Sequence, residues 1–213
     1  MMTKIRVILV DDHNVVRSGL RRLLEMGGDI DVVAEADSGE QACEVYNDFP
    51  ADVLVMDVSM PGIGGLEALR RILAVSPDAK IVIFSMHENA AFATHALSIG
   101  ARCYVAKTSF ADDLLLAVRE AAADRTYISP HIAQKIVLQS VPALQNPIQR
   151  LSTREFEVFR LLAEGRSVED ISTILNISHK TTANYQTILK QKLGISNAVG
   201  LVRFAIQHGI ITN

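Results

Sequence analysis

Short apolar runs alternate with amphipathic segments through the first 124 residues of the chain. The runs are rich in Val and Ile, which is typical of strands buried on both faces of a sheet. They are Ile5–Val10, Asp31–Ala36, Val53–Met56, Lys80–Phe84 and Cys103–Val105. The amphipathic segments, which predict helices, are 14–26, 39–49, 65–75, 89–98 and 111–123. This alternation predicts a doubly wound α/β domain: a five-stranded parallel sheet with helices on both faces, and any site at the carboxyl ends of the strands.

The strand pattern stops after about residue 124, which marks a domain boundary. Residues 141–149 contain two prolines and no charged side chain, which is typical of a linker. A short helix is expected before them, at Pro130–Gln139. The chain therefore divides into a first domain, a linker and a second domain, at residues 1–124, 125–149 and 150–213.

The second domain has a purely helical pattern, with four predicted helices. Ser152 and Glu155 have the spacing of a capping box, in which each side chain satisfies a free backbone donor of the first turn. That helix is expected to end at Gly165. The other helices begin at Ser167, Ser178 and about Ser196. The second and third helices, joined by a turn at residues 176–178, have the form of a helix-turn-helix inside an all-α domain.

Charge separates the two domains, although the whole chain carries only −3. Residues 1–124 hold 11 Lys and Arg against 19 Asp and Glu, a balance of −8. Residues 125–213 hold 10 against 5, a balance of +5. The second domain can therefore bind nucleic acid, which the acidic first domain would repel.

Composition excludes several other classes of protein. Hydrophobic residues make up 49% of the chain, a globular rather than a disordered or fibrous composition. Cys43 and Cys103 are isolated from each other, which indicates reduced packing residues in a reducing compartment. No stretch is long and apolar enough to span a bilayer, and the apolar run near the N-terminus is too short for a signal peptide. We expect a cytoplasmic protein without a membrane partner.

Three aspartates follow two strands that are neighbours in a doubly wound sheet. Asp11 and Asp12 come directly after the first strand, and Asp57 comes directly after the third. Taken alone, each is better explained as a helix cap or a loop residue. Together, like charges crowded at one edge need a cation, and Mg²⁺ is the usual hard ion with oxygen ligands.

A hydroxyl and an ammonium join these carboxylates, because Ser85 follows the fourth strand and Lys107 follows the fifth. A carboxylate nucleophile, a metal ion, a hydroxyl and an ammonium are the groups that stabilise charge during in-line transfer of a phosphoryl group. A serine or lysine in a loop carries little information by itself. The whole set, placed at successive strand ends, indicates that Asp57 is phosphorylated.

The first domain resembles the receiver domains of two-component response regulators over about residues 4–124. The resemblance rests on Val10-Asp11-Asp12-His13, Met56-Asp57-Val58-Ser59-Met60-Pro61-Gly62, Phe84-Ser85-Met86 and Tyr104-Val105-Ala106-Lys107. It implies a flavodoxin-like fold in which Asp57 accepts a phosphoryl group from a sensor histidine kinase. It further implies a regulator rather than an enzyme, one able to catalyse only its own phosphoryl transfer and dephosphorylation.

The same resemblance implies roles for the residues around Asp57. Lys107 would pair with the phosphoryl group, while Ser85 moves toward that group and Tyr104 turns inward as the family's switch. The ligands implied for Mg²⁺ are Asp12, Asp57, the backbone carbonyl of Ser59 and, through a water molecule, Asp11.

Two segments depart from the family's pattern. The loop after Asp57 reads Gly62-Ile63-Gly64-Gly65, without the acidic residue or Asn that many relatives carry, so a more flexible loop is expected. Thr108 stands where many receivers have a proline after the lysine, so the cis peptide bond of those relatives is not expected here.

The third helix of the second domain has an apolar face and a polar face, and no acidic residue follows Asp170 in the chain. The expected core face is Thr182, Tyr185, Ile188, Leu189 and Leu193. The opposite face is Lys180, Thr181, Ala183, Asn184, Gln186, Thr187, Lys190 and Gln191. Short polar side chains between lysines suit base edges and phosphates in a major groove. Periodicity alone leaves open a merely solvated amphipathic helix.

The second domain also resembles a known family, the LuxR-type helix-turn-helix. The matching residues are Leu151–Val158, Leu162–Gly165, Ile171, Ile174–Leu175, Ile177–Thr181 and Leu189–Gly194. Joined to a receiver, this domain makes a response regulator of the NarL/FixJ type. The resemblance implies that double-stranded DNA bases face Ala183, Asn184 and Thr187, and that phosphates face Lys180, Thr181 and Lys190. Some relatives have lysine where Ala183 and Thr187 stand, so the family does not define the operator.

These observations predict a transcription regulator switched by phosphorylation of Asp57. It is expected to bind DNA as a homodimer once phosphorylated, because one small helix-turn-helix contacts too few base pairs. A regulator with a receiver-like domain that works without phosphorylation is the alternative. A flavodoxin-like cofactor protein is disfavoured because Asp11 and Asp12 would repel a phosphate after the first strand. A phosphoaspartyl hydrolase is disfavoured because those two aspartates are adjacent rather than two residues apart.

Overall fold

The computed structural model of the chain describes residues 4–139 and 147–211, in two compact units. The units are Met1–Glu88 with Ala96–Ala133, and Asn89–His95 with Gln134–Asn213. Most of the expected linker at 141–149 lies outside the described residues.

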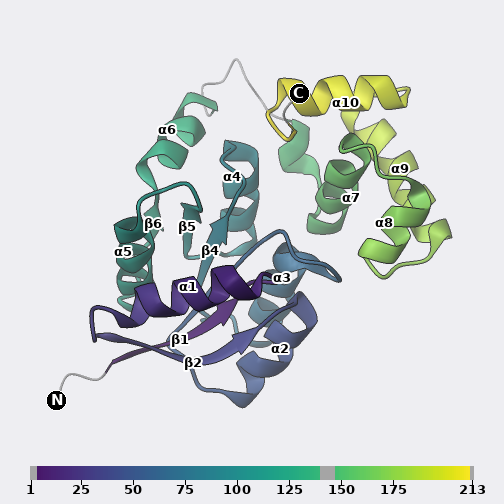
Figure 1. Cartoon of the computed structure of the whole chain (residues 1–213). Helices are drawn as coiled ribbons and strands as arrows, with labels where there is room; N and C mark the ends of the chain where they lie inside the picture. Colours follow the sequence, from purple (N-terminus) through teal and green to yellow (C-terminus); the bar gives the residue numbers. More distant parts are fainter. Residues whose placement is uncertain (1–3, 140–146, 212–213) are drawn as a thin grey trace. The chain divides into compact units, whose positions relative to one another are not determined.

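The first unit is built on a parallel sheet with the strand order β2-β1-β3-β4-β5-β6 (Figure 1). The strands are β1 (Ile5–Val10), β2 (Ile30–Ala36), β3 (Val53–Met56), β4 (Ile81–Ser85), β5 (Cys103–Ala106) and β6 (Tyr127–Ile128). The reversal of order between β1 and β3 is the switch point at which doubly wound sheets bind their ligands. The predicted doubly wound parallel sheet is therefore confirmed.

Within the described residues the sheet has six strands, so the predicted number of five was wrong. The additional strand, β6, is only two residues long and pairs with Cys103 and Tyr104 of β5. The N–H of Tyr127 also donates to the Sγ of Cys103 at 3.2 Å. Two residues are too few to show the alternation of apolar and polar positions that indicates a strand. This strand also lies in the segment expected to begin the linker. Tertiary pairing rather than a local pattern defines it.

Helices follow the strands as expected and cover both faces of the sheet (Figure 1). They are α1 (Asn14–Glu25), α2 (Gly39–Asp48), α3 (Gly64–Val75), α4 (Ala90–Ile99) and α5 (Ala111–Ala122). A further helix, α6 (Pro130–Gln139), follows β6 and, like α4, is divided between the two units. Leu24 of α1 and Leu114 of α5 belong to one core cluster with Val7, Val55 and Val105 of the sheet. Every residue of β3 is at most 1% exposed, which explains why its sequence is apolar throughout.

The second unit contains the predicted helices after a 3₁₀ turn at Pro147–Arg150. They are α7 (Thr153–Ala163), α8 (Val168–Ile174), α9 (His179–Leu193) and α10 (Ala198–Gln207). The capping box is confirmed: the N–H of Ser152 donates to Glu155 at 2.7 Å, and the N–H of Glu155 donates back to Ser152 at 3.4 Å. Gly194 ends α9 with a φ of 68°, a left-handed conformation that favours glycine.

The helix-turn-helix, α8 and α9, packs against α7, and α10 packs against α7 in turn. Phe159 of α7 and Phe204 of α10 meet edge to face, with ring centroids 6.1 Å apart. A buried hydrogen bond of 2.9 Å joins the hydroxyls of Ser172 in α8 and Thr182 in α9. This hydrogen bond links the two helices of the motif, and each hydroxyl also bonds to a backbone carbonyl of its own segment, Ser172 to Val168 at 2.6 Å and Thr182 to Ser178 at 3.3 Å.

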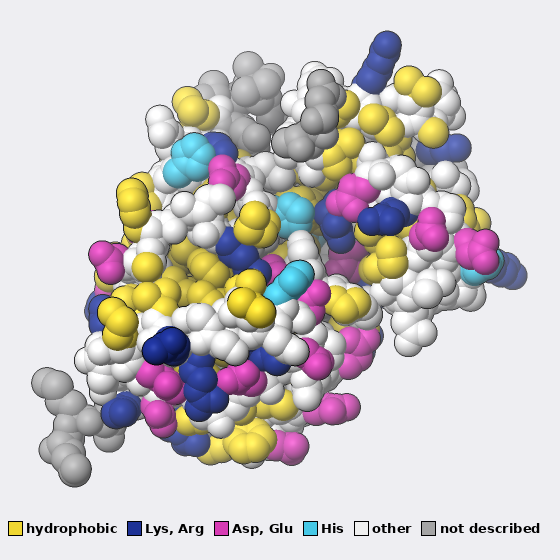
Figure 2. Space-filling view, viewed as in Figure 1, with side chains coloured by type: hydrophobic (Ala, Val, Ile, Leu, Met, Phe, Trp, Pro, Cys, Tyr) yellow, Lys and Arg dark blue, Asp and Glu magenta, His cyan; other side chains and the backbone are white. Residues whose placement is uncertain are grey.

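Charges of both signs are interspersed on the surface of the first unit. Figure 2 shows Lys and Arg side chains beside Asp and Glu side chains over the region of α1 and β2. Arg17 and Arg21 of α1 both pair with Glu35 of β2, at 2.9 and 2.8 Å. In the part of the chain that the structure describes, no helix is long and apolar enough to cross a membrane.

Candidate functional site

Two of the three carboxylates expected to converge, those of Asp11 and Asp57, do so at the carboxyl edge of the sheet. β1 pairs with β3 so that Val10 lies opposite Met56, and Asp11 and Asp57 therefore leave neighbouring strands side by side. The N–H of Asp57 donates to the carbonyl of Val10 at 2.9 Å. The side chains of Asp11 and Asp57 are only 1% and 4% exposed. Two carboxylates so far removed from water require a counter-charge.

Lys107 supplies that counter-charge within the protein. Its Nζ lies 2.6 Å from Oδ2 of Asp11 and 2.8 Å from Oδ2 of Asp57. The backbone N–H of Lys107 donates to the carbonyl of Ser85 at 2.7 Å, which fixes the lysine at the end of β5. Burial by itself would lower the pKa of the Lys107 ammonium, but its hydrogen bonds to the two carboxylates outweigh that effect and raise the pKa.

The other oxygen of each carboxylate is held by the backbone. Oδ1 of Asp57 accepts from the N–H of Ser59 at 3.2 Å, and Oδ1 of Asp11 accepts from the N–H of His13 at 2.9 Å. These bonds orient both carboxylates and bring the backbone of Ser59 beside Asp57. The residue expected to offer a metal its carbonyl therefore lies next to the proposed phosphoacceptor.

Asp12 adds a further oxygen donor beside Asp11, although Asp57 does not belong to the same close group of possible metal ligands. Its Oδ1 is buried and, among the described residues, has no hydrogen-bond partner. Nδ1 of His13 lies 2.9 Å from that oxygen but is not aligned to donate to it. Possible ligand atoms of Asp11, Asp12 and His13 all lie within 4.8 Å of one another. Because Mg²⁺ prefers oxygen to imidazole, the carboxylates rather than His13 fit that ion.

Arg17 holds the first aspartate loop in place, a role that the sequence did not reveal. Its Nη1 donates to the carbonyl of Asp11 at 2.5 Å, while its Nε bonds to Glu35 at 2.9 Å. Arg17 reads as an ordinary polar residue of an amphipathic helix, and no sequence pattern distinguishes it from Arg21 or Arg22.

The two expected switch residues meet at His87, which sequence reasoning also missed. Ser85 and Tyr104 are both fully buried, and burial raises the pKa of the Tyr104 phenol well above its usual range. Oγ of Ser85 accepts from the N–H of His87 at 3.2 Å, and the hydroxyl of Tyr104 donates to the carbonyl of His87 at 2.7 Å. Nε2 of His87 lies 2.9 Å from Oγ of Ser59. One residue thus contacts both switch side chains and the loop after Asp57.

Three glycines of the loop after Asp57 have a geometric reason to be glycine. Gly62 and Gly64 have positive φ values of 80° and 73°. A Cβ on Gly65 would lie 2.0 Å from the carbonyl oxygen of Asp57, an impossible contact. Gly62 and Gly64 are therefore explained by their backbone conformation, and Gly65 is explained by its close packing. Thr108, the second departure from the family's pattern, donates its hydroxyl to Glu88, and no described peptide bond is cis.

The second candidate site is the solvent-facing side of α9. Lys180, Thr181, Ala183, Asn184 and Thr187 are exposed, and Lys190 is half-buried. Thr182 and Leu189 are buried on the opposite side. The remaining residues of the expected core face are only half-buried: Tyr185, Ile188 and Leu193. The structure therefore presents all six predicted DNA-contacting residues on the outer part of the helix.

The lysines near α9 fall into two kinds. Lys180 and Lys190 have no carboxylate partner among the described residues. Nζ of Lys192 instead lies 2.7 Å from Oε2 of Glu155, whose side chain is 8% exposed. Lys192 is thus committed to the packing of α9 against α7, and the free positive charge of the helix is carried by Lys180 and Lys190.

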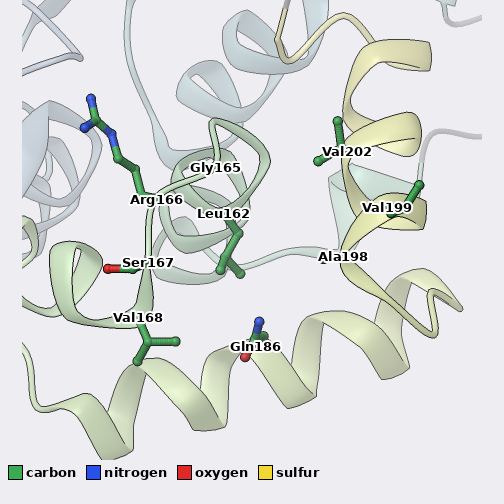
Figure 3. A pocket seen from close by; sticks show the side chains of 9 residues that line it. All are labelled: Leu162, Gly165, Arg166, Ser167, Val168, Gln186, Ala198, Val199 and Val202. Atoms are coloured by element: carbon green, nitrogen blue, oxygen red, sulfur yellow. The ribbon is translucent and has the colours of Figure 1, made fainter.

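A groove of about 440 Å³ lies behind α9, between its neighbours in the second unit. Its lining is Leu162, Gly165, Arg166, Ser167, Val168, Gln186, Ala198, Val199 and Val202. Figure 3 shows Gln186 pointing from α9 into this groove, toward α7 and α10. Gln186 therefore does not share the outward face with Asn184 and Thr187, on which the sequence pattern had placed it.

Comparison with known proteins identifies a family for each part of the chain. Residues 7–119 match the model of the response regulator receiver domain. Residues 149–205 match the model of bacterial regulatory proteins of the luxR family. The first match spans the pocket at Asp57, and the second spans α7, α8, α9 and most of α10.

Relatives with the same two parts match nearly the whole chain. The response regulator GacA of Pseudomonas aeruginosa is 38% identical over 209 residues, covering 97% of this chain and 98% of that protein. The response regulator UvrY of Escherichia coli is 38% identical over 208 residues, covering 97% and 95%.

A solved structure shares the arrangement of elements. RcsB of Salmonella enterica serovar Typhimurium, bound to the rprA promoter in the presence of the phosphomimetic BeF3−, is 28% identical with a TM-score of 0.73. The likeness covers 95% of this chain and 98% of that one. The chain belongs to the two-component response regulators in which a receiver domain is joined to a LuxR-type DNA-binding domain.

Proposed function

We propose that Asp57 accepts a phosphoryl group from a sensor histidine kinase, and that the modified protein binds double-stranded DNA as a homodimer. The observation that carries this proposal is the buried carboxylate of Asp57 held 2.8 Å from the ammonium of Lys107. In the transfer, an oxygen of Asp57 bonds to phosphorus while the bond between phosphorus and the kinase's histidine nitrogen breaks. That nitrogen keeps the electron pair, and the product is an acyl phosphate.

Two groups of the pocket are placed to respond to the added charge. Lys107, already charged and buried, would pair with a phosphoryl oxygen in place of part of its present carboxylate contacts. Ser85 would turn its hydroxyl toward the phosphoryl group and lose its bond to the N–H of His87. The hydroxyl of Tyr104 donates to the carbonyl of His87, so a movement of His87 would also move Tyr104.

Mg²⁺ fits the donors at this edge. We assign it to carboxylate oxygens of Asp12 and Asp57 and to the carbonyl of Ser59, with Asp11 acting through a water molecule. When bound, the ion neutralises charge on the transferred phosphoryl group. The buried Oδ1 of Asp12, which lacks a hydrogen-bond donor, supports this assignment. The same pocket is proposed to catalyse its own phosphoryl transfer from small donors and its own dephosphorylation.

The helix-turn-helix is the proposed output. Ala183, Asn184 and Thr187 would face bases, and phosphates would be met by Lys180, Thr181 and Lys190. We propose that residues 1–124 act as the receiver, 125–149 as the linker and 150–213 as the DNA-binding domain. Because a kinase's phosphohistidine and DNA are accessible together in the cytoplasm, we place the protein there.

The test is a mobility-shift assay on duplexes that the full-length protein selects from a random pool. Wild type treated with acetyl phosphate and Mg²⁺ should bind more tightly than untreated wild type, and as a dimer. Asp57→Asn, treated in the same way, should stay at the untreated level. Asp78→Asn changes an exposed aspartate far along the chain from the pocket and should behave as wild type. Equal binding by treated wild type and Asp57→Asn would instead favour regulation without phosphorylation.

A further inference from the structure

Three exposed residues of α9 form one patch between Lys180 and Lys190. Ala183, Asn184 and Thr187 are all exposed, and residues three or four positions apart lie side by side on a helix. The two lysines are ten residues apart, about 15 Å along the helix axis. The middle of the outward face is therefore occupied by an alanine, an asparagine and a threonine.

The hydroxyl proton of Thr187 is already used inside the helix. Its Oγ1 donates to the carbonyl of Ala183 at 3.1 Å. A hydroxyl has a single proton, so Thr187 presents only lone pairs and a methyl group to its surroundings. In the major groove guanine offers two acceptors, O6 and N7, to which Thr187 in this conformation cannot donate.

The other two residues are equally poor partners for guanine. Ala183 offers only a methyl group. The side-chain amide of Asn184 has no hydrogen-bond partner within residues 4–139 and 147–211, so its donor and its acceptor are both available. The NH₂ group and the carbonyl oxygen of the amide lie side by side and match the N7 acceptor and the N6 amino donor of adenine, whereas guanine presents two acceptors, to which the carbonyl oxygen cannot donate.

No arginine occurs in α9, although arginine or lysine bound to guanine is the commonest specific contact in major grooves. Of the lysines, Lys192 is paired with Glu155, and the remaining two stand at the ends of the patch. We propose that the recognition helix reads A·T base pairs, with Asn184 on an adenine and the methyl groups of Ala183 and Thr187 on thymine methyl groups. This inference rests on the proposed DNA-binding role of α9.

The first test uses the full-length protein treated with acetyl phosphate and a pool of random duplexes. The positions with the strongest base preference in each half-site should be A·T. Uracil in place of a contacted thymine removes only the C5-methyl group and should weaken binding about fourfold per methyl. Replacement of the contacted adenine by 7-deazaadenine should weaken binding of wild type but not of Asn184→Ala.

Matched variants at one exposed position separate the methyl group from the hydroxyl. Thr187→Val keeps a methyl group and loses the hydroxyl, so it should keep the preference for thymine over uracil. Thr187→Ser keeps the hydroxyl and loses the methyl, so it should bind alike the duplexes with thymine and with uracil at the position that Thr187 contacts, and keep the preference for thymine at the position that Ala183 contacts. Because residue 187 is exposed, both variants should melt as wild type does.

Selection of G·C pairs at the positions of strongest preference would overturn the inference, as would equal binding of thymine and uracil duplexes by wild type. Neither result would contradict the proposed function, since the protein would still bind DNA. Failure to enrich any duplex, with and without acetyl phosphate, would instead contradict the DNA-binding role itself.

Discussion

Lys107 makes the burial of two aspartates tolerable. Breaking a buried ion pair by removal of one partner costs several kcal/mol, because it leaves an uncompensated charge away from water. Here a single ammonium lies within hydrogen-bond distance of both Asp11 and Asp57. Any cation or phosphoryl group that enters the pocket therefore changes contacts that already hold the pocket together.

Replacing this lysine should make the stability of the first unit depend on divalent cations. In the presence of EDTA, Lys107→Gln is expected to lower the free energy of unfolding by about 3 kcal/mol, since two carboxylates remain buried without their partner. Mg²⁺ should restore much of the loss by taking over the neutralisation. Urea unfolding with and without Mg²⁺ measures both effects.

Lys80→Gln is the matched control, because Lys80 pairs at 2.9 Å with Asp124, whose side chain is 64% exposed. It should change stability little and should not create a dependence on Mg²⁺. Equal stability of Lys107→Gln and wild type in EDTA would show that the ammonium does not carry the role assigned to it.

Sequence predicted the charged residues of the pocket but not the residues that orient them. Asp11, Asp57 and Lys107 could be placed together because strand order fixes where strand ends meet. Arg17 and His87 could not, since their roles depend on particular side-chain and backbone hydrogen bonds rather than on residue type or spacing. The order of the strands can be inferred from the periodicity of the sequence, whereas individual hydrogen bonds can be identified only in the structure.

At the scale of elements, the β3–α3 connection is defined by its glycines. Gly65 packs directly against the backbone of Asp57, a close approach that the sequence did not reveal. A side chain there must displace either α3 or the end of β3, and with it the carboxylate. The short strand β6 could not be predicted from the sequence, because only its pairing with β5 defines it.

Gly65→Ala should therefore destabilise the first unit by about 1–3 kcal/mol, the usual range for overpacking. It should also slow phosphorylation by acetyl phosphate, since Asp57 would move. Gly19→Ala, at an exposed position of α1 where a Cβ meets nothing within 4 Å, should instead stabilise the protein by about 0.5–1 kcal/mol. Thermal unfolding measures both changes in stability. A stability change of the same sign in Gly65→Ala and Gly19→Ala would contradict the packing role given to Gly65.

The two kinds of lysine on α9 lead to a further prediction. Lys190→Gln should weaken DNA binding and reduce the salt dependence of the binding constant by about one released counterion, with unchanged stability. Lys192→Gln should lower the free energy of unfolding by up to about 1 kcal/mol, since Lys192 is 40% exposed and pairs with Glu155. The salt dependence of DNA binding by Lys192→Gln should equal that of wild type.

Titrations at several salt concentrations and thermal melts of both variants check this division. An equal loss of salt dependence in the two variants would show that Lys192 also contacts phosphates. A loss of stability in Lys190→Gln would show that this ammonium has a structural partner.

At the scale of the whole molecule, the small net charge is the sum of two opposed halves. The balance of −8 over residues 1–124 includes the carboxylates of the proposed phosphoacceptor pocket, and the balance of +5 over residues 125–213 includes the lysines of α9. A single figure of −3 argues weakly against nucleic-acid binding, whereas its division between two domains supports that function. Phosphorylation adds negative charge to the half that is already acidic.

The central claim is that Asp57 is the phosphoacceptor of a pocket completed by Mg²⁺. Intact-mass spectrometry after incubation with acetyl phosphate or phosphoramidate tests it most directly. Wild type should gain the mass of one phosphoryl group when Mg²⁺ is present and none when EDTA replaces it, and Asp57→Asn should gain none in either case. No gain by wild type with either donor, or an equal gain by Asp57→Asn, would contradict the claim.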